Sequence, residues 1–303
     1  MPNVSAIIPA FNAERFVGEA ILSVLGQTYQ DFEITVIDDG STDLTEEAVR
    51  AFDKEERLKY VRQSNRGPSA ARNAGLKVSS GRLIAFLDAD DVWLPGKLEA
   101  QVQALSSSPQ PSVVYSDFGL IDDEGRPLPR TWMRGPSHDS LAADLMFGNV
   151  IAGSASSVLL PKEFFRSVGV FDEELWTCED QDMWRRLAMV YGFLFLEAVH
   201  VLVRVHASQL QGDPAKMAQG RLLHLEKMER DTPPSLRHYL PDVEYATYKD
   251  VSRLMLRGHR PVAALGYLGR VSRLGADYVL RLFLDVGRGV IRRVTRRRGA
   301  PRP

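Results

Sequence analysis

Short apolar runs alternate with longer segments of helical periodicity along the first ninety residues. The apolar runs are rich in β-branched residues and cover residues 4–9, 33–38, 57–62 and 82–88. Helical spacing of apolar positions covers residues 14–27, 44–54 and 68–80. Strands that begin roughly every 25 residues and are separated by helices predict βαβ units and a parallel sheet. Helix-start signals agree, because Asp43 and Glu46 have capping-box spacing and Pro68 follows Gly67 as a first helical residue.

The pattern is less regular in the second half of the chain. We expect a helix around Leu98, then strands, turns and helices over residues 112–118, 122–127, 129–150, 154–161 and 178–191, and a closing strand pair over 193–206. After about Asp213 only helical periodicity remains, with breaks at 231–235, 257–261 and near Gly275. The sequence therefore predicts an α/β domain over residues 1–212 and a helical appendage over residues 213–303.

Composition indicates a folded protein with an uneven distribution of charge. The chain has 303 residues, of which 44% are hydrophobic and 25% charged, and its formal net charge is −1. Residues 281–303 contain eight arginines and one aspartate, a charge of +7, so the remaining residues carry −8. A basic tail on an acidic body points to an anionic partner, either nucleic acid or an acidic membrane surface.

The cysteine count and the N-terminus bear on the compartment. The single cysteine, Cys178, excludes an internal disulfide and a thiolate-based metal site, and it agrees with a reducing compartment. The first residues lack the pattern of a signal peptide, and no apolar run reaches the roughly 18 residues that span a bilayer. We therefore expect a cytoplasmic protein.

Charged residues concentrate where the predicted parallel strands end. Ligands of open parallel sheets bind at the carboxyl ends of the strands, where loops and helix N-termini converge. The residues at these ends are Pro9, Ala10, Phe11, Asp38, Asp39, Asn65, Arg66, Gly67, Asp88, Asp90 and Asp91. This edge of the sheet is the predicted ligand site.

The segment VIDDGSTD, residues 36–43, has two interpretations. A turn at Gly40 followed by a capped helix explains the last four residues but gives the carboxylates of Asp38 and Asp39 no function. An ionised carboxylate only accepts hydrogen bonds, so it suits an imide or amide N–H such as that of uracil, thymine or guanine. The segment by itself leaves both interpretations open.

The segment AFLDADDVW, residues 85–93, ends a predicted strand in three aspartates. Two unit charges about 5 Å apart cost roughly 3 kcal/mol at an effective dielectric constant of about 20, which favours protonation or a bound cation. On an extended segment Asp88 and Asp90 project to the same side. Oxygen ligands of this kind suit Mg²⁺ or Mn²⁺ bridging to a substrate phosphate. The plainer alternative is solvated acids, one of which caps the next helix.

Four motifs occur in a fixed order: VSAIIPAFN, ILSVLGQTYQDFEITVIDDGSTD, NRGPSAARNAGLKVSSGRLIAFLDADD and CEDQDMWRRLA. With them the chain resembles family 2 glycosyltransferases of bacterial cell-surface polysaccharide biosynthesis, over about residues 4–210. The resemblance implies a GT-A fold, a Rossmann-like domain with a mostly parallel central sheet that binds a nucleotide-diphospho-sugar. The helices after residue 212 lie outside it.

The resemblance also implies roles for residues of these motifs. Pro9, Ala10 and Phe11 would line the nucleoside pocket. Asp39 would hold the base, Asp88 the ribose and Asp90 the metal, and Arg72 would face the nucleotide. Asp91 is left with two possibilities, to cap the next helix or to assist the site.

The same comparison gives Asp180 of the segment TCEDQDMW the role of catalytic base, with Glu179 and Trp184 contacting the acceptor or shaping its pocket. The structural alternative makes Thr177 an N-cap, Glu179 and Asp180 first-turn acids and Asp182 a surface residue. Cys178 is expected to be a small packed residue.

His206 has two possible roles. The resemblance places it near the metal and the diphosphate, and the alternative is a strand-end histidine with no ligand role.

The C-terminal segment has helical spacing of apolar residues, with arginines largely on other faces. The apolar positions are Tyr278, Val279, Leu282, Phe283, Val286, Val290, Ile291 and Val294, and the arginines are Arg281, Arg288, Arg292 and Arg296. One interpretation is a core-packing helix followed by a disordered basic end. The other is an interfacial helix on an anionic membrane, which would attach the protein peripherally to the inner face of the cytoplasmic membrane. Nucleic acid is disfavoured because no groove-reading motif accompanies the arginines.

Together these features predict an inverting glycosyltransferase that uses Mg²⁺ or Mn²⁺. Its donor would be a UDP-, TDP- or GDP-linked sugar, and its acceptor hydroxyl would belong to a lipid-linked or saccharide molecule. A nucleotidyltransferase is disfavoured because PAFNAERF lacks the glycines of a triphosphate loop. A catalytically silent nucleotide-binding subunit is the other alternative, and the complete set Asp39, Asp88, Asp90 and Asp180 argues against it.

Overall fold

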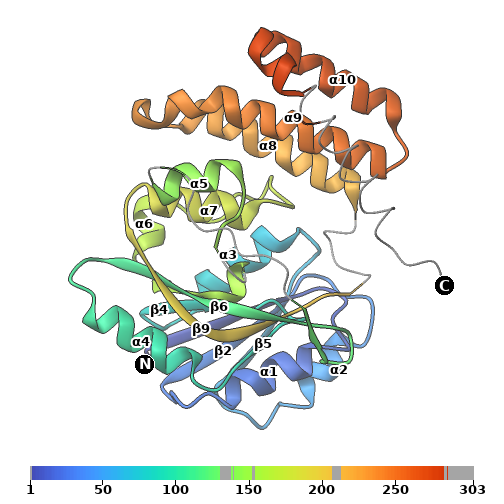
Figure 1. The fold of residues 1–303 in the computed structure, drawn as a ribbon. Coiled ribbons are helices and arrows are strands. Elements are labelled where there is room, and N and C mark those ends of the chain that lie inside the picture. Colours follow the sequence, from blue (N-terminus) through green and yellow to red (C-terminus); the bar gives the residue numbers. More distant parts are fainter. Residues whose placement is uncertain are drawn as a thin grey trace, which may run out of the picture. The chain divides into compact units, whose positions relative to one another are not determined.

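The computed structural model describes residues 2–129, 138, 140–151, 154–206, 213–282 and 285. The chain divides into two compact units, Met1–Gly212 and Asp213–Pro303 (Figure 1).

The first half of the sheet is parallel, as the strand and helix alternation predicts. Its strands are β1 (Val4–Ala10), β2 (Phe32–Asp38), β3 (Leu58–Arg62) and β4 (Leu83–Phe86), arranged in the order β3-β2-β1-β4. Nearly every residue of β1 and β2 is buried, as expected for parallel strands covered on both faces. In this register Ala10 pairs with Asp38 and Asp38 with Arg62, so three strand ends lie side by side.

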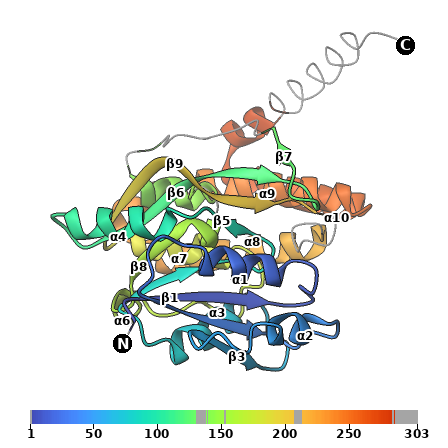
Figure 2. The same ribbon diagram turned by 90° about the horizontal axis from the view of Figure 1, so that it is seen from below.

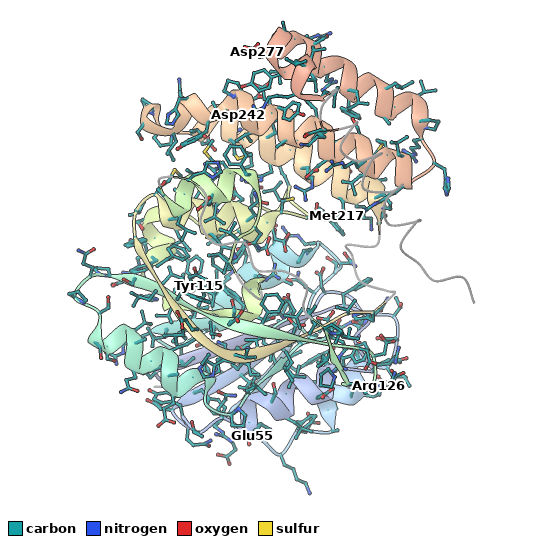
Figure 3. The ribbon with its side chains drawn as sticks, in the orientation of Figure 1. Glu55, Tyr115, Arg126, Met217, Asp242 and Asp277 are labelled. Carbon is teal, nitrogen blue, oxygen red and sulfur yellow. The ribbon has the colours of Figure 1, made fainter. Side chains whose placement is uncertain are left out.

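The second half of the sheet is mixed and continues in the order β8-β6-β9-β5. The strands are β5 (Val92–Trp93), β6 (Ser112–Ile121), β8 (Val158–Pro161) and β9 (Gly192–Arg204), with β7 (Pro127–Leu128) paired to β6. β8 is antiparallel to β4 and β6, and β5 to β9, whereas β6 and β9 are parallel and run side by side (Figure 2). Tyr115 of β6, which is labelled in Figure 3, contacts the rings of Phe193 and Phe195 across this pair.

Three local predictions for the first unit were wrong. The expected closing strand pair is a single strand, β9, whose pairing with β6 shifts register on both sides of Asp117. The expected strand over 154–161 begins as the 3-10 helix η1 (Ser154–Ser157). Asp43 and Glu46 form no capping box: Asp43 accepts from the backbone N–H and the hydroxyl of Thr45, and Glu46 pairs with arginines.

Helices cover both faces of the sheet. On one face lie α1 (Val17–Leu25), α2 (Thr45–Arg50) and α4 (Lys97–Ser107), and on the other α3 (Pro68–Val78), α5 (Leu141–Phe147), α6 (Phe164–Val168) and α7 (Glu179–Ala188) (Figure 1). β1 supplies both cores because successive side chains alternate: Ala6 and Ile8 enter one cluster and Ile7 the other. Pro68 is the first residue of α3, as predicted.

The second unit is helical. It contains α8 (Pro214–Asp231), η3 (Pro234–Tyr239), α9 (Leu240–Arg257), α10 (Pro261–Val271) and η4 (Ser272–Leu274). α9 packs against both α8 and α10 around a small core of Ala218, Val251, Met255 and Ala264. The predicted tail residues Phe283, Val286, Arg288, Val290, Ile291, Arg292, Val294 and Arg296 lie outside the described residues. Among the described helices, none is long and apolar enough to cross a membrane.

Candidate functional site

The turn after β2 is held by the carboxylate of Asp38, which is fully buried. Its Oδ1 accepts from the backbone N–H of Ser41 at 2.7 Å, and its Oδ2 accepts from the hydroxyl of Tyr60 at 2.6 Å. Burial alone would raise the pKa of Asp38, but these hydrogen bonds and the nearby Arg62 hold it below its ordinary value. Asp38 therefore shapes the turn, because both of its oxygens accept hydrogen bonds from within the protein.

Asp39 joins the loops that follow β1, β2 and β3. Its backbone N–H donates to the carbonyl of Ala10 at 2.8 Å. Its carboxylate accepts from Gln63 Nε2 at 2.7 Å and from the backbone N–H groups of Arg66 at 3.0 Å and Gly67 at 2.7 Å. A carboxylate has about four acceptor positions, so one remains for a ligand N–H. Asp39 also fixes the N-terminus of α3 through the two backbone contacts.

The residues that end β1 differ in exposure. Ala10 is 2% exposed, and its carbonyl bonds to Asp39. Phe11 is 49% exposed, which leaves its ring open to a planar ligand. Pro9, the residue before Ala10, is partly exposed. Of the three, only Phe11 offers a large side chain at this edge.

Arg72 of α3 connects two acids from distant segments. Its Nη2 donates to Asp88 Oδ1 at 2.8 Å, and its Nη1 donates to Glu179 Oε1 at 2.7 Å. The guanidinium is 4% exposed and lies 5.5 Å from the centre of the Phe171 ring. Burial would lower the pKa of Arg72, but the two carboxylates raise it. Arg72 therefore remains a cation beneath the turn after β4 and the start of α7.

Glu179 has an unusual acidity. Burial and the charge of Asp180 raise its pKa to about 7 from an ordinary value of 4.5, and Arg72 opposes this only in part. Near neutral pH this carboxyl is therefore partly protonated.

Asp90 and His206 meet in the candidate metal site. Asp90 Oδ2 lies 2.9 Å from His206 Nε2, and the imidazole packs against the ring of Phe16. Within the described residues no three metal-ligating side chains cluster closely enough to hold a metal by themselves. Mg²⁺ is commonly held by one or two carboxylates plus substrate phosphates, so an acid with an adjacent imidazole fits such an ion. The remaining ligands would come from the substrate.

The contacts of Asp91 are with the protein itself, and they exclude the helix-capping role. Its side chain is buried, and its two oxygens accept from the hydroxyl of Ser156 at 2.6 Å and from the backbone N–H of Arg204 at 3.0 Å. The same hydroxyl accepts from the backbone N–H of Asp88 at 3.0 Å. Burial, with Asp90 and Asp88 nearby, raises the pKa of Asp91 well above its ordinary value. Asp91 supports the turn and does not cap α4, whose N-cap is Gly96.

The start of α7 differs from the structural alternative predicted for it. The N-cap is Cys178, with φ of +65° and no side-chain cap, in place of Thr177. Cys178 is partly buried, which is compatible with a small packed residue. Asp182 was expected on the surface but is fully buried, and it accepts from Arg186 Nε at 2.9 Å.

Asp180, the proposed base, is oriented by local contacts. Its Oδ2 accepts from Asn149 Nδ2 at 2.8 Å, and its Oδ1 accepts from the backbone N–H of Gln181 at 2.7 Å. Asn149 comes from the segment after α5, in which the sequence contains no recognisable motif. The only available signal was its place in the irregular stretch before η1.

Trp184 is a core residue, so of its two expected roles only that of shaping a pocket is compatible with its burial. Its side chain is fully buried in the core and meets Phe171 edge-on, with ring centres 6.3 Å apart. Trp176, which the sequence analysis did not select, is 40% exposed and packs closely against Gly67. The exposed indole at this site is therefore that of Trp176.

Arg204 is a further residue that the sequence analysis missed. It is 1% exposed, and its side chain donates to the backbone carbonyls of Asp90 at 2.9 Å and Asp122 at 2.9 Å. Its guanidinium also lies 4.7 Å from the centre of the Phe16 ring. Arg204 thus fixes the acidic turn against the end of β9.

Comparison with known proteins identifies the family. The sequence model described as glycosyl transferase family 2 matches residues 5–169, more than half of the chain. The chain belongs to glycosyltransferase family 2. This family 2 chain is 32% identical over 213 residues to an uncharacterized glycosyltransferase of Rickettsia felis, a match that covers 69% of the chain and 35% of the relative. It therefore spans about a third of that protein's length.

A second relative has a specific name. The family 2 chain is 40% identical over 121 residues to the Escherichia coli protein named UDP-Glc:alpha-D-GlcNAc-diphosphoundecaprenol beta-1,3-glucosyltransferase WfgD, covering 40% of the chain and 47% of the relative. Among solved structures, the mannosyltransferase PcManGT from Pyrobaculum calidifontis in complex with GDP-Man and Mn²⁺ superposes with a TM-score of 0.62 at 21% identity. That match covers 92% of this chain and 82% of the other. The fold is GT-A, with C-terminal helices.

Proposed function

We propose that this chain is an inverting glycosyltransferase that moves a sugar from a nucleotide-diphospho-sugar to an acceptor hydroxyl in polysaccharide or glycolipid assembly. The observation that carries the proposal is the position of Arg72. Its two short hydrogen bonds bring Asp88, from the end of β4, together with Glu179, from the start of α7. Asp88, expected on the donor side, and Glu179, expected on the acceptor side, therefore share the guanidinium of Arg72.

The donor would bind along the carboxyl edge of β1, β2 and β4. Asp39 has a free acceptor position for the N–H of a uracil, thymine or guanine base, and the exposed ring of Phe11 offers a stacking face. Asp88 would contact the ribose. The name of the E. coli relative includes UDP-Glc and the solved mannosyltransferase holds GDP-Man, so both classes of base are candidates here.

Asp90 and His206 would hold Mg²⁺ or Mn²⁺ together with the donor phosphates. When bound there, the ion would neutralise charge on the departing diphosphate. The 2.9 Å approach of Asp90 Oδ2 to His206 Nε2 supports this pair as adjacent ligands.

The chemical step would be a single displacement with Asp180 as general base. The acceptor oxygen forms a bond to the anomeric carbon while its proton passes to Asp180. The bond from that carbon to the phosphate oxygen breaks, and the electron pair leaves on the nucleoside diphosphate. Asn149 orients Asp180 for this role, and Glu179 lies beside it on the acceptor side.

The name of one relative and the distribution of charge support a lipid-linked acceptor and a location at the membrane. A lipid-linked acceptor agrees with the diphosphoundecaprenol in the name of the E. coli relative. The basic tail after residue 281 would attach the protein to the inner face of an anionic membrane. A nucleic-acid partner is not part of the proposal.

Two measurements test the proposal. A thermal-shift screen of UDP, TDP and GDP sugars with and without Mn²⁺ should give stabilisation by one base class, about 2.7 kcal/mol at 100 times the dissociation constant. Release of nucleoside diphosphate should then follow in the wild type and fall by at least about 100-fold in Asp180→Asn. The control is Glu173→Gln, because Glu173 belongs to an exposed ion pair with Arg66. Binding without turnover would indicate a silent subunit, and no binding at all would overturn the donor site.

A further inference from the structure

The outer side of α10 combines exposed apolar residues with arginines. Val262 is 83% exposed and Leu265 is 68% exposed, whereas Ala264 and Val271 face the core of the helical unit. Gly266 and Gly269 share the outer side, and a Cβ added at either would meet nothing within 4 Å. We call Val262, Leu265, Gly266, Gly269, Arg270 and Arg273 the α10 outer face.

The charge around this face has one sign. Between Val251 and Ala276 the sequence contains five arginines and no acidic residue, and the next acids along the chain are Asp250 and Asp277, the latter labelled in Figure 3. Arg253 pairs with Asp250 at 3.3 Å. Within the part of the chain that the structure describes, Arg257, Arg260, Arg270 and Arg273 have no carboxylate partner within 4.0 Å, and all four are exposed.

A shallow hollow lies along the same helix. It measures about 580 Å³ and is lined by Ala263, Gly266, Tyr267, Gly269, Arg270 and Arg273. The guanidinium of Arg270 lies 5.1 Å from the centre of the Tyr267 ring, which holds it at the edge of the hollow. The face therefore offers a recess with cationic donors beside two projecting apolar side chains.

We propose that the α10 outer face docks onto an anionic lipid bilayer, with Val262 and Leu265 inserted at the interface and the arginines bound to lipid phosphates. Apolar residues flanked by basic ones are the pattern of interfacial helices. Each basic residue near an anionic surface adds to the binding free energy. A second copy of the chain is disfavoured because two such faces would repel each other. Nucleic acid is disfavoured because Val262 and Leu265 offer it no hydrogen bond. This inference does not depend on the chemistry at Asp180.

Co-sedimentation of the full chain with vesicles tests the proposal. Binding is expected to vesicles of phosphatidylcholine with phosphatidylglycerol, to weaken with added salt, and to be lost with phosphatidylcholine alone. Val262→Asp with Leu265→Asp should abolish most of the binding. Arg273→Gln should weaken it about fivefold, the factor that corresponds to about 1 kcal/mol. The controls Leu22→Asp, at a position 58% exposed on α1, and Arg253→Gln should bind as the wild type does.

A second measurement separates this face from the basic tail. Tryptophan fluorescence of Leu265→Trp should be quenched by spin-labelled lipid beyond the wild-type level, and that of Leu22→Trp should not. Vesicle binding without quenching at position 265 would assign the binding to the tail and overturn the proposal. Wild-type binding by the double aspartate variant would also overturn it. A dimer of the chain that forms in the absence of lipid and is abolished by this variant would overturn it as well. An unchanged helical signal in circular dichroism shows that the helical unit of the variant is folded.

Discussion

Asp90 Oδ2 lies 2.9 Å from Nε2 of His206, although the two residues are 116 positions apart in the sequence. The pairing of β5 with β9, in which Val92 faces Leu202, brings the acidic turn to the end of β9. We expect Asp90→Ala and His206→Ala each to raise the Mn²⁺ concentration needed for half-maximal donor hydrolysis, because each removes a donor atom. The expected factor is at least about 10-fold, the range seen when metal-site groups are removed.

Metal titration of donor hydrolysis measures this factor. Asp53→Ala is the matched control, because Asp53 is a 63% exposed acid on a surface turn. Identical metal dependence in His206→Ala and the wild type would contradict a metal-ligand role for this histidine.

Arg72→Gln is expected to destabilise the fold as well as the site. The substitution leaves Asp88 and the buried Glu179 without their shared cation, and removing one partner of a buried pair typically costs about 3–5 kcal/mol. The comparison variant is Arg66→Gln, because Arg66 is 59% exposed and pairs with Glu173, an arrangement worth about 1 kcal/mol or less.

Urea unfolding measures both changes. Adding Glu179→Gln to Arg72→Gln should recover part of the loss, since the double variant no longer buries an unpaired charge. Equal costs for Arg72→Gln and Arg66→Gln would show that burial adds nothing at position 72.

Glu179 should make stability depend on pH in an identifiable window. Its pKa is about 7 in the folded protein and 4.5 ordinarily, so between these values the native state holds a proton that the unfolded chain has lost. The free energy of unfolding therefore falls as the pH rises from 4.5 to 7, by about 3 kcal/mol in total, and stays level above it.

Denaturation at several pH values checks this, with Glu179→Gln as the variant. The difference between the wild-type and variant slopes isolates Glu179 from other groups. Glu173→Gln, at a position 39% exposed, should keep the wild-type slope. Parallel curves for the wild type and Glu179→Gln would mean that this carboxyl titrates normally.

The sequence predicted the parallel half of the sheet and the strand-end acids because both depend on local signals. Continuous apolar runs rich in β-branched residues and the turn glycine at Gly40 are visible in a short window. The relation of Arg72 to Glu179 depends on residues 107 positions apart, which no window contains. The choice between the two expected roles of Trp184 could not be read from the sequence for a similar reason: an aromatic residue on an amphipathic helix can face either the core or a ligand, and only the packing against Phe171 decides.

The three aspartates that follow β4 also have roles that the sequence leaves undecided. Asp88, Asp90 and Asp91 look equivalent in the sequence. In the structure only Asp91 is turned inward, toward the Ser156 hydroxyl and the backbone of Arg204. Those partners come from η1 and β9, segments whose form was predicted incorrectly. The site could therefore be located from the sequence, but the division of roles within it could not.

Two helical glycines should respond in opposite ways to the same substitution. In Gly75→Ala the added Cβ would stand 2.3 Å from Ile7 Cγ2, so α3 would have to move away from β1. Overpacking of this kind costs about 1–3 kcal/mol, which exceeds the gain of about 1 kcal/mol that alanine brings to a helix interior. In Gly266→Ala the Cβ meets nothing within 4 Å, so only the helix gain remains. Urea unfolding should show a loss for the first variant and a gain for the second. A gain for Gly75→Ala would mean that α3 does not need this close approach to β1.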